Sequence, residues 1–361
     1  MTSRSPSEAV RILDRRRVRL ATRALAAVLG LLCAGAAQGE KFALEARPPI
    51  ALPGGEAGID LDDLWYDAEL DRLLVPAAAT GRLDLVDPKH GRVSSAPDFG
   101  RSARSAGAPA AEVTSADAGG GLVLTSDGSE PRLVALGGKS LALVASAPLA
   151  SPPDYLRYLA ERREIWVTEP RTAAIEIFSL APGSPPVLAR LATVAVPGGP
   201  EALVFDAARG RAYSNLWQDR TVAIDLATRA VVADWSAGCA EPRGLAFDAR
   251  NALLFVGCKD GTVAVLDVAH DGRVVTRATA GAGVDIIAFD PERRHLFVPG
   301  ARAATLTLFS VGVAGDLHLL ASAPTAEHAH CVVIDGRGGA WVCDPRHGRL
   351  LVFRDHAAAS R

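Results

Sequence analysis

The chain has 361 residues, is 49% hydrophobic and carries a formal net charge of −2, with 39 lysines and arginines against 41 aspartates and glutamates. A chain of this length can bury a large core, and two domains would be the ordinary expectation unless the sequence repeats. Because both signs of charge are scattered along the chain, no nucleic-acid-binding surface is expected.

The first 38 residues have the order of a secretory signal peptide. A basic stretch (11–23) precedes the apolar run ALAAVLGLL (24–32), and small residues follow. The pattern predicts cleavage between Ala36 and Gly39. The apolar run is too short to span a bilayer comfortably and no later segment is longer, so we expect no membrane span after cleavage. The sequence therefore predicts a periplasmic or secreted protein.

The remaining chain, residues 39–361, is built from repeats. Segments 201–215, 243–257 and 285–299 align without a gap at a spacing of 42 residues, and each consists of an apolar run, a polar turn and a second apolar run. A third β-rich run follows each frame, and usually a fourth. Four short strands per unit are typical of a β-propeller blade. The sequence predicts an all-β fold, one seven-bladed β-propeller of four-stranded antiparallel blades, with frames that start near residues 62, 112, 154, 201, 243, 285 and 330.

The last frame has only three strands before the chain ends, whereas the first frame is preceded by a β-rich segment without a blade of its own, KFALEARPPIAL (41–52). We expect this segment to become the outer strand of the seventh blade, which would close the ring and cover exposed strand edges. The alternative is a disordered leader.

Three stretches carry a resemblance to a known family: PEALVFD (200–206), CAEPRGLAFDARNALLFVGC (239–258) and GVDIIAFDPERRHLFVP (283–299). They resemble the YVTN-type, YncE-like seven-bladed propellers of the bacterial periplasm, and the likeness of the repeats extends over residues 50–355. The resemblance implies the propeller fold. It leaves the function open among binding proteins, parts of quinoprotein pathways and a few enzymes.

The first residue of every frame is polar or charged. The first strand of a propeller blade lines the central channel, so these residues are expected to form one ring near a channel mouth. Two unit charges about 6 Å apart repel by roughly 2.8 kcal/mol at an effective dielectric constant near 20, so the acids of the ring need an arginine, a protonated histidine, raised pKa values, water or a cation. The predicted ring consists of Asp62, Glu112, Asp154, Glu201, Arg243, Asp285 and His330.

A divalent cation, Ca²⁺ above all, is one candidate for the centre of this ring. Gluconolactonase-like propellers, which are metal-dependent lactonases, hold calcium in a similar central place with glutamate, aspartate and asparagine. The chain after the signal has only two asparagines, Asn215 and Asn251, which argues against a close likeness. The alternative is a wide, wet channel that simply solvates the acids. The candidate metal ligands are Asp154, Glu201, Asp285, Asn215 and His330.

The four cysteines after the signal fall into two pairs, each flanking a hairpin. We expect the disulfides Cys239–Cys258 and Cys331–Cys343, each within one blade. The segment EHAHC (327–331) also places two histidines two residues apart, which on an extended strand would share a face and form a metal pair. A loop histidine beside a channel histidine is the favoured alternative, because nothing completes a zinc site.

Other motifs add little chemistry. No GxSxG nucleophile motif, CxxC or CxxCH is present. Trp65, Trp166 and Trp341 lie in strand runs and are expected in blade cores, whereas Trp217 follows a strand and is a candidate stacking surface. We therefore expect an exported, monomeric and non-enzymatic binding protein that holds a protein or a small polar ligand at the acidic ring. The alternatives are a calcium-dependent lactonase and an accessory subunit of a periplasmic quinoprotein or redox system.

Overall fold

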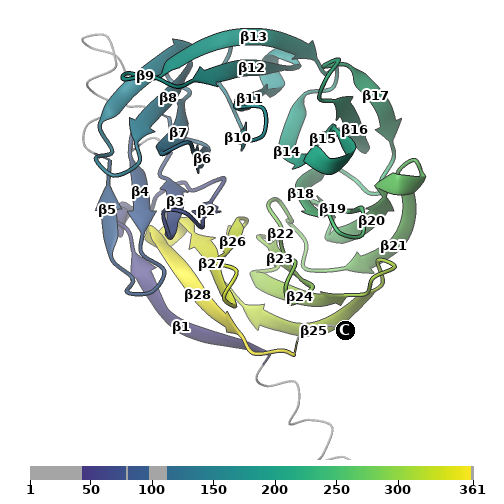
Figure 1. Cartoon of the computed structure of the whole chain (residues 1–361). Coiled ribbons are helices and arrows are strands. Elements are labelled where there is room, and N and C mark those ends of the chain that lie inside the picture. The colour runs from purple at the N-terminus through teal and green to yellow at the C-terminus, as the bar shows by residue number, and fades with distance from the viewer. Residues whose placement is uncertain (1–42, 79, 97–111, 359–361) are drawn as a thin grey trace, which may run out of the picture. The chain divides into compact units, whose positions relative to one another are not determined.

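The computed structural model describes residues 43–78, 80–96 and 112–358, and these form seven four-stranded antiparallel sheets. The sheets stand around a common axis, as blades of a ring, with one strand of each innermost (Figure 1). The predicted seven-bladed β-propeller is confirmed. The predicted signal peptide lies outside the described residues. Within the described ranges, no helix has both the length and the apolar character needed to cross a membrane.

Six blades take their strands in chain order from the axis outward, and the described residues also form five short 3-10 helices between strands. Blades 1 to 3 consist of β2 (Trp65–Asp67), β3 (Arg72–Pro76), β4 (Leu83–Val86) and β5 (Val93–Ser95); β6 (Ala116–Gly119), β7 (Leu122–Asp127), β8 (Arg132–Gly137) and β9 (Leu143–Pro148); and β10 (Leu156–Leu159), β11 (Glu164–Glu169), β12 (Ala174–Ala181) and β13 (Val187–Ala195). Blades 4 to 6 consist of β14 (Pro200–Asp206), β15 (Arg211–Leu216), β16 (Arg220–Asp225) and β17 (Val231–Trp235); β18 (Pro242–Asp248), β19 (Leu253–Cys258), β20 (Thr262–Asp267) and β21 (Arg273–Thr279); and β22 (Ala288–Asp290), β23 (His295–Gly300), β24 (Thr305–Val311) and β25 (Leu317–Pro324). The 3-10 helices are η2 (Gly55–Ala57), η3 (Pro170–Thr172), η4 (Ala207–Arg209), η5 (Val268–His270) and η6 (Pro345–His347).

The seventh blade closes the ring as the sequence predicts. It combines β26 (Val332–Ile334), β27 (Gly339–Asp344) and β28 (Arg349–Asp355) with β1 (Leu44–Ala51), which pairs antiparallel with β28 as the outer strand. In Figure 1 the purple strand β1 runs beside the yellow strand β28. The pairing covers the outer edge of β28, and the alternative of a disordered leader is wrong for the part of segment 41–52 that the structure describes.

A repeated aspartate ends most inner strands and sets the turn that follows. The Asp206 carboxylate accepts the backbone N–H of Arg209 at 3.1 Å, and the Asp290 carboxylate accepts that of Glu292 at 2.9 Å. Aspartate side chains stabilise turns in this way because they replace a backbone acceptor. These turns fix where the second strand of the blade begins, and therefore fix the register of the inner strand against it.

The blades are held together by apolar packing between neighbouring sheets. Three phenylalanines at the same frame position contact an aromatic ring on the second strand of the preceding blade: Phe205 lies 5.6 Å from Trp166, Phe247 5.6 Å from Tyr213 and Phe289 4.8 Å from Phe255, between ring centroids. Aromatic pairs at such distances combine large buried area with a preferred geometry. The repeated phenylalanine therefore joins each of these blades to the one before it.

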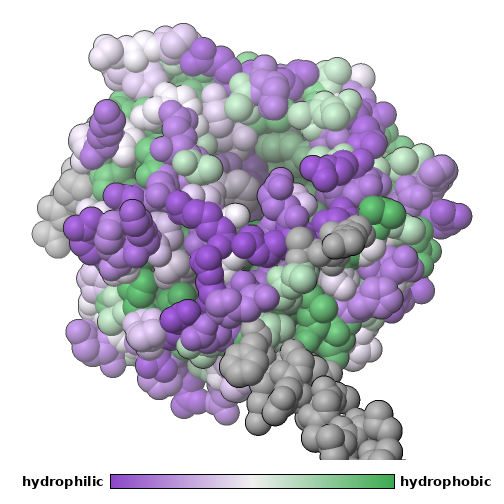
Figure 2. Space-filling view, turned by 60° about the horizontal axis from the view of Figure 1, so that its bottom comes forward, coloured by the Kyte–Doolittle hydropathy of each residue, from purple (hydrophilic) through white to green (hydrophobic). Residues whose placement is uncertain are grey.

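Both predicted disulfide pairs lie within single blades. Cys239 and Cys258, in blade 5, have a Cα–Cα distance of 6.1 Å, and Cys331 and Cys343, in blade 7, one of 5.5 Å; the two sulfurs of each pair are bonded. The surface is mostly hydrophilic in the space-filling view, with hydrophobic residues in scattered patches (Figure 2).

Candidate functional site

Four of the predicted ring acids act on one another at one mouth of the channel. Burial raises the pKa of Asp62 well above its ordinary value, and the charge of Asp285 is the next cause. Burial and then the charge of Asp62 raise the pKa of Asp154 in the same way. Glu201 adds to both shifts. Asp62, Asp154, Glu201 and Asp285 are therefore near enough for their charges to influence one another.

One of these acids is already neutralised within the protein. Glu201 is 6% exposed; the Arg243 guanidinium donates to its Oε1 at 2.9 Å, and the Trp217 indole N–H donates to its Oε2. The Arg243 guanidinium lies 4.6 Å from the centroid of the Trp217 ring, a cation–π contact. Trp217 is 47% exposed, so it offers a rigidly held aromatic surface at the mouth.

The other three acids have no such partner. In the described part of the chain, the carboxylates of Asp62, Asp154 and Asp285 make no hydrogen bond or ion pair. The pKa of Asp285 is raised by burial, and the charges of His330 and Arg243 only moderate the increase. Three recessed carboxyl groups with raised pKa values and no bonded cation form a site in which each negative charge, once its proton is lost, has no counter-charge.

The structure does not place Glu112 in this ring. Glu112 is exposed, and Thr114 occupies the equivalent position in blade 2. A backbone hydrogen bond between neighbouring blades indicates this: the N–H of Asp63 donates to Thr114 O, just as the N–H of Ile286 donates to the carbonyl of the ring residue His330. The frame of blade 2 is shifted by two residues because its first turn contains only Gly120 and Gly121, whereas the corresponding turns elsewhere contain four residues.

The predicted metal ligands are not gathered around one point. Asn215 is fully buried, where its amide N–H₂ donates to Arg243 O and Gly244 O, and its Oδ1 accepts from Thr221. It therefore holds adjacent blades together and does not face the acids. Among the described residues, no group of three ligands drawn from the ring carboxylates and His330 lies close enough to share one metal ion.

In the described part of the chain, one group of three potential metal ligands has its ligand atoms within 4.8 Å of one another. It consists of His330, Cys331 and Cys343. Both sulfurs belong to the disulfide, whereas thiolates are what metals bind. The two-histidine motif does not form a face either. His328 has φ 66°, so the segment turns, and the ring nitrogen Nδ1 of His330 is bonded to His328 O at 2.7 Å.

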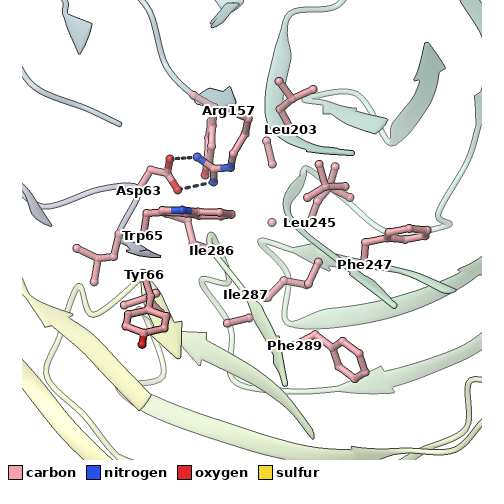
Figure 3. Close-up of a pocket in the computed structure, with 18 of the residues that line it drawn as sticks. Asp63, Trp65, Tyr66, Arg157, Leu203, Leu245, Phe247, Ile286, Ile287 and Phe289 are labelled. Carbon is pink, nitrogen blue, oxygen red and sulfur yellow. Dashed lines mark hydrogen bonds and ion pairs between the residues drawn. The ribbon is translucent and has the colours of Figure 1, made fainter. Parts of the chain in front are cut away.

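A cavity of about 520 Å³ follows directly behind the acidic mouth. It is lined by the inner strands of all seven blades, and its wall is mainly apolar (Figure 3). The residues that come one position after ring acids in the chain, such as Asp63, Tyr155, Ala202 and Ile286, line it. The labelled apolar side chains are Leu203, Leu245, Phe247, Ile286, Ile287 and Phe289.

A buried ion pair forms the polar side of this cavity. The Arg157 guanidinium donates to both carboxylate oxygens of Asp63, at 2.5 and 2.7 Å, and Ser115 Oγ donates to the same carboxylate at 2.5 Å. The side chains of Asp63 and Arg157 are 1% and 10% exposed. The guanidinium also lies 4.4 Å from the Trp65 ring (Figure 3). Trp65 thus lines the cavity, and it also packs against the hydrophobic core of blades 1 and 2. Trp166 and Trp341 are buried, as expected.

Two further polar groups face the cavity. Tyr155 is 3% exposed and its hydroxyl has no hydrogen-bond partner among the described residues; burial, and then the charges of Asp62 and Asp285, raise its pKa well above 10. The hydroxyl therefore lies at the acidic end and stays protonated. Asp117 accepts the backbone N–H groups of Ala118 and Tyr158, each at 2.7 Å, and burial raises its pKa to about 7.

Sequence reasoning missed the residues of the cavity because it compared only the first column of the repeat. Asp63 and Tyr155 are the second residues of their frames, and Arg157 is the fourth residue of its frame; in most other frames these two positions are apolar. A charged residue inside an otherwise apolar strand was the available signal. The partner of that residue lies two blades away and could not be read from spacing.

No protein-family model and no curated protein matches the sequence. Solved structures do match: one chain from "Crystal Structure of Mitotic Checkpoint Complex" superposes with a TM-score of 0.71 at 14% identity, over 86% of this chain and 91% of that chain. In all, 1795 chains of solved structures are similar, so the architecture is widely shared. The likeness concerns the fold: the chain is a seven-bladed β-propeller.

Proposed function

We propose that the protein is an exported binding protein whose acidic channel mouth holds a cationic group, an amine or guanidinium, of a small polar ligand or of a protein partner. The three carboxylates without partners, Asp62, Asp154 and Asp285, carry this proposal, because a cation would relieve their mutual repulsion. Trp217, which contacts Glu201 and Arg243 and is about half exposed, would add a cation–π contact. The leader of residues 1–38 supports export.

Spermidine serves as the first probe of this site. Calorimetric titration at low ionic strength is expected to give saturable binding, and Asp62→Asn with Asp285→Asn should weaken it at least roughly tenfold, since two charges facing the cation are lost. The free energy of unfolding of the double variant should be unchanged or higher, because repulsion is removed. Binding should also weaken as the pH falls, from a higher pH than ordinary aspartates would require, because protonated carboxyls do not attract a cation.

A matched control keeps the net charge of the double variant. Glu161→Gln with Asp316→Asn removes two exposed carboxylates outside the ring and should leave spermidine affinity within about twofold. Equal weakening in both double variants would indicate a general charge effect, and absence of saturable binding to the wild type would overturn the cation site. A lysine-rich peptide, titrated in parallel, distinguishes a protein partner from a small amine.

A separate experiment addresses the calcium-dependent hydrolase. Because the ring carboxylates do not converge in the described residues, chelator treatment followed by Ca²⁺ is expected to leave the melting temperature unchanged, and metal analysis should find no stoichiometric ion. Stoichiometric metal together with a metal-dependent rise in melting temperature would favour the hydrolase instead.

A further inference from the structure

We propose that the cavity inside the channel is a second binding site, for a small, uncharged and mainly apolar molecule that carries a carbonyl or other acceptor oxygen. This inference goes beyond the cation site, because it uses different side chains and a different ligand chemistry. Either site can exist without the other.

The size and lining of the cavity determine the body of the ligand. Its volume of about 520 Å³ lies in the range of roughly 300–1,000 Å³ that is usual for small-molecule sites. Leu203, Leu245 and Ile286 lie in its wall on three blades, and Phe247 and Phe289 lie farther from the axis in the same wall (Figure 3). Such a wall favours an aliphatic or aromatic body, since burial of apolar surface is the main available driving force.

The polar groups in the wall argue against a charged ligand. Asp63 and Arg157 neutralise each other's charge through two hydrogen bonds, so a charged ligand would have to disturb a buried ion pair to gain a counter-charge. Asp117 is occupied by two backbone N–H groups, and burial keeps it partly protonated near neutral pH by raising its pKa to about 7. The interior of the cavity therefore offers little net charge.

Tyr155 determines the polar end of the ligand. Its side chain is more than nine-tenths buried, it lines the cavity, and its hydroxyl has no partner in the described part of the chain. A hydroxyl that faces the cavity and has no partner in the protein is free to donate to an acceptor that enters. Because the phenol stays protonated, it would donate to an oxygen of the ligand, at the end of the cavity nearest the acids.

Prodan, a neutral naphthalene ketone whose emission shifts in apolar surroundings, is a suitable probe, and 2-dimethylaminonaphthalene is its analogue without the ketone. The full-length mature protein is expected to bind Prodan saturably with a blue shift. Tyr155→Phe should weaken Prodan binding by roughly three- to tenfold and leave the analogue almost unchanged, since only the hydrogen bond is lost. Tyr158→Phe is the matched control. Tyr158 also lines the cavity, but its side chain lies against Gly119 and Gly120 in another part of the wall.

Filling the cavity provides a second test. Leu245→Trp is expected to abolish Prodan binding, whereas Leu319→Trp, on the outer strand β25 and 64% exposed, should bind as the wild type does. Spermidine binding should persist in Leu245→Trp, which separates this site from the cation site. If Leu245→Trp does not fold, Ile286→Phe fills the same cavity from the next blade.

The outcomes separate clearly. No saturable Prodan binding, or equal binding in the wild type and a folded cavity-filling variant, overturns the site. Equal loss of both probes in Tyr155→Phe, or no loss of either, overturns the acceptor oxygen. Loss of Prodan with retention of the analogue supports the proposal.

Discussion

Replacement of Arg157 by methionine is expected to lower the free energy of unfolding by about 3–5 kcal/mol, because it leaves the Asp63 carboxylate buried without its counter-ion. The pair has the geometry in which this effect is largest: two hydrogen bonds, and a carboxylate that is 1% exposed. Equilibrium denaturation with urea measures the change, provided that the slope of the transition is unaltered.

Two control variants isolate the unpaired charge as the cause. The double variant Asp63→Asn with Arg157→Met removes both charges and should recover most of the loss, since the amide oxygen that replaces the carboxylate would still accept from Ser115. Arg346→Met breaks an exposed pair with Glu327 and should cost less than about 1 kcal/mol. If the single and double variants at the buried pair were equally unstable, packing of the Arg157 stem, and not its charge, would account for the loss.

The second large effect is a fall in stability as the pH rises from about 5 to about 8. Burial raises the pKa of Asp117 from 3.8 to about 7, and burial together with the charge of Glu176 raises that of Glu169 from 4.5 to about 7. At a pH between the ordinary and the raised pKa of such a group, the folded state still holds a proton that the unfolded chain has released. The free energy of unfolding therefore decreases as the pH increases through this range. Each buried group contributes on the order of 3 kcal/mol over its full window, and the ring acids act in the same direction.

Denaturation at a series of pH values, with and without substitution, checks this expectation. Asp117→Asn and Glu169→Gln should each make the free energy of unfolding less dependent on pH. In the range between the ordinary and the raised pKa of the replaced group, the reduction should correspond to up to about one proton. Carboxylates with lowered pKa values, such as Asp71 and Asp127, change stability with the opposite sign and at lower pH. A stability that increases from pH 5 to pH 8, or a slope unaffected by both variants, would contradict the assignment of these protons.

The fold could be predicted because repetition turns weak local signals into a strong one. The Asp206, Asp248 and Asp290 turns recur at one spacing, so the blades in between align without ambiguity. The prediction for blade 2 was wrong where that spacing changes. The turn of two glycines shifts the frame by two residues, so the ring position is occupied by Thr114 and not by Glu112. The error shows that register follows from turn length, which a fixed repeat frame does not measure.

The candidate site was only partly predictable, for a different reason. The acidic mouth is a property of one column of the repeat, so sequence alone could find it. The cavity depends on contacts such as that of Asp63 with Arg157, which join residues 94 positions apart in blades 1 and 3. Neither residue has a partner at a characteristic spacing, and the apolar residues around them are indistinguishable in sequence from an ordinary core.

The pairing of β1 with β28 also orders events in time. Leu44, near the start of the described chain, lies opposite Asp355, near its end, so β1 has no partner strand until almost all of the described chain has been synthesised. Contacts between such distant positions form slowly, because the loop entropy is lost before the contact is gained. Until β28 is made, the strand edge of β1 stays open to other chains.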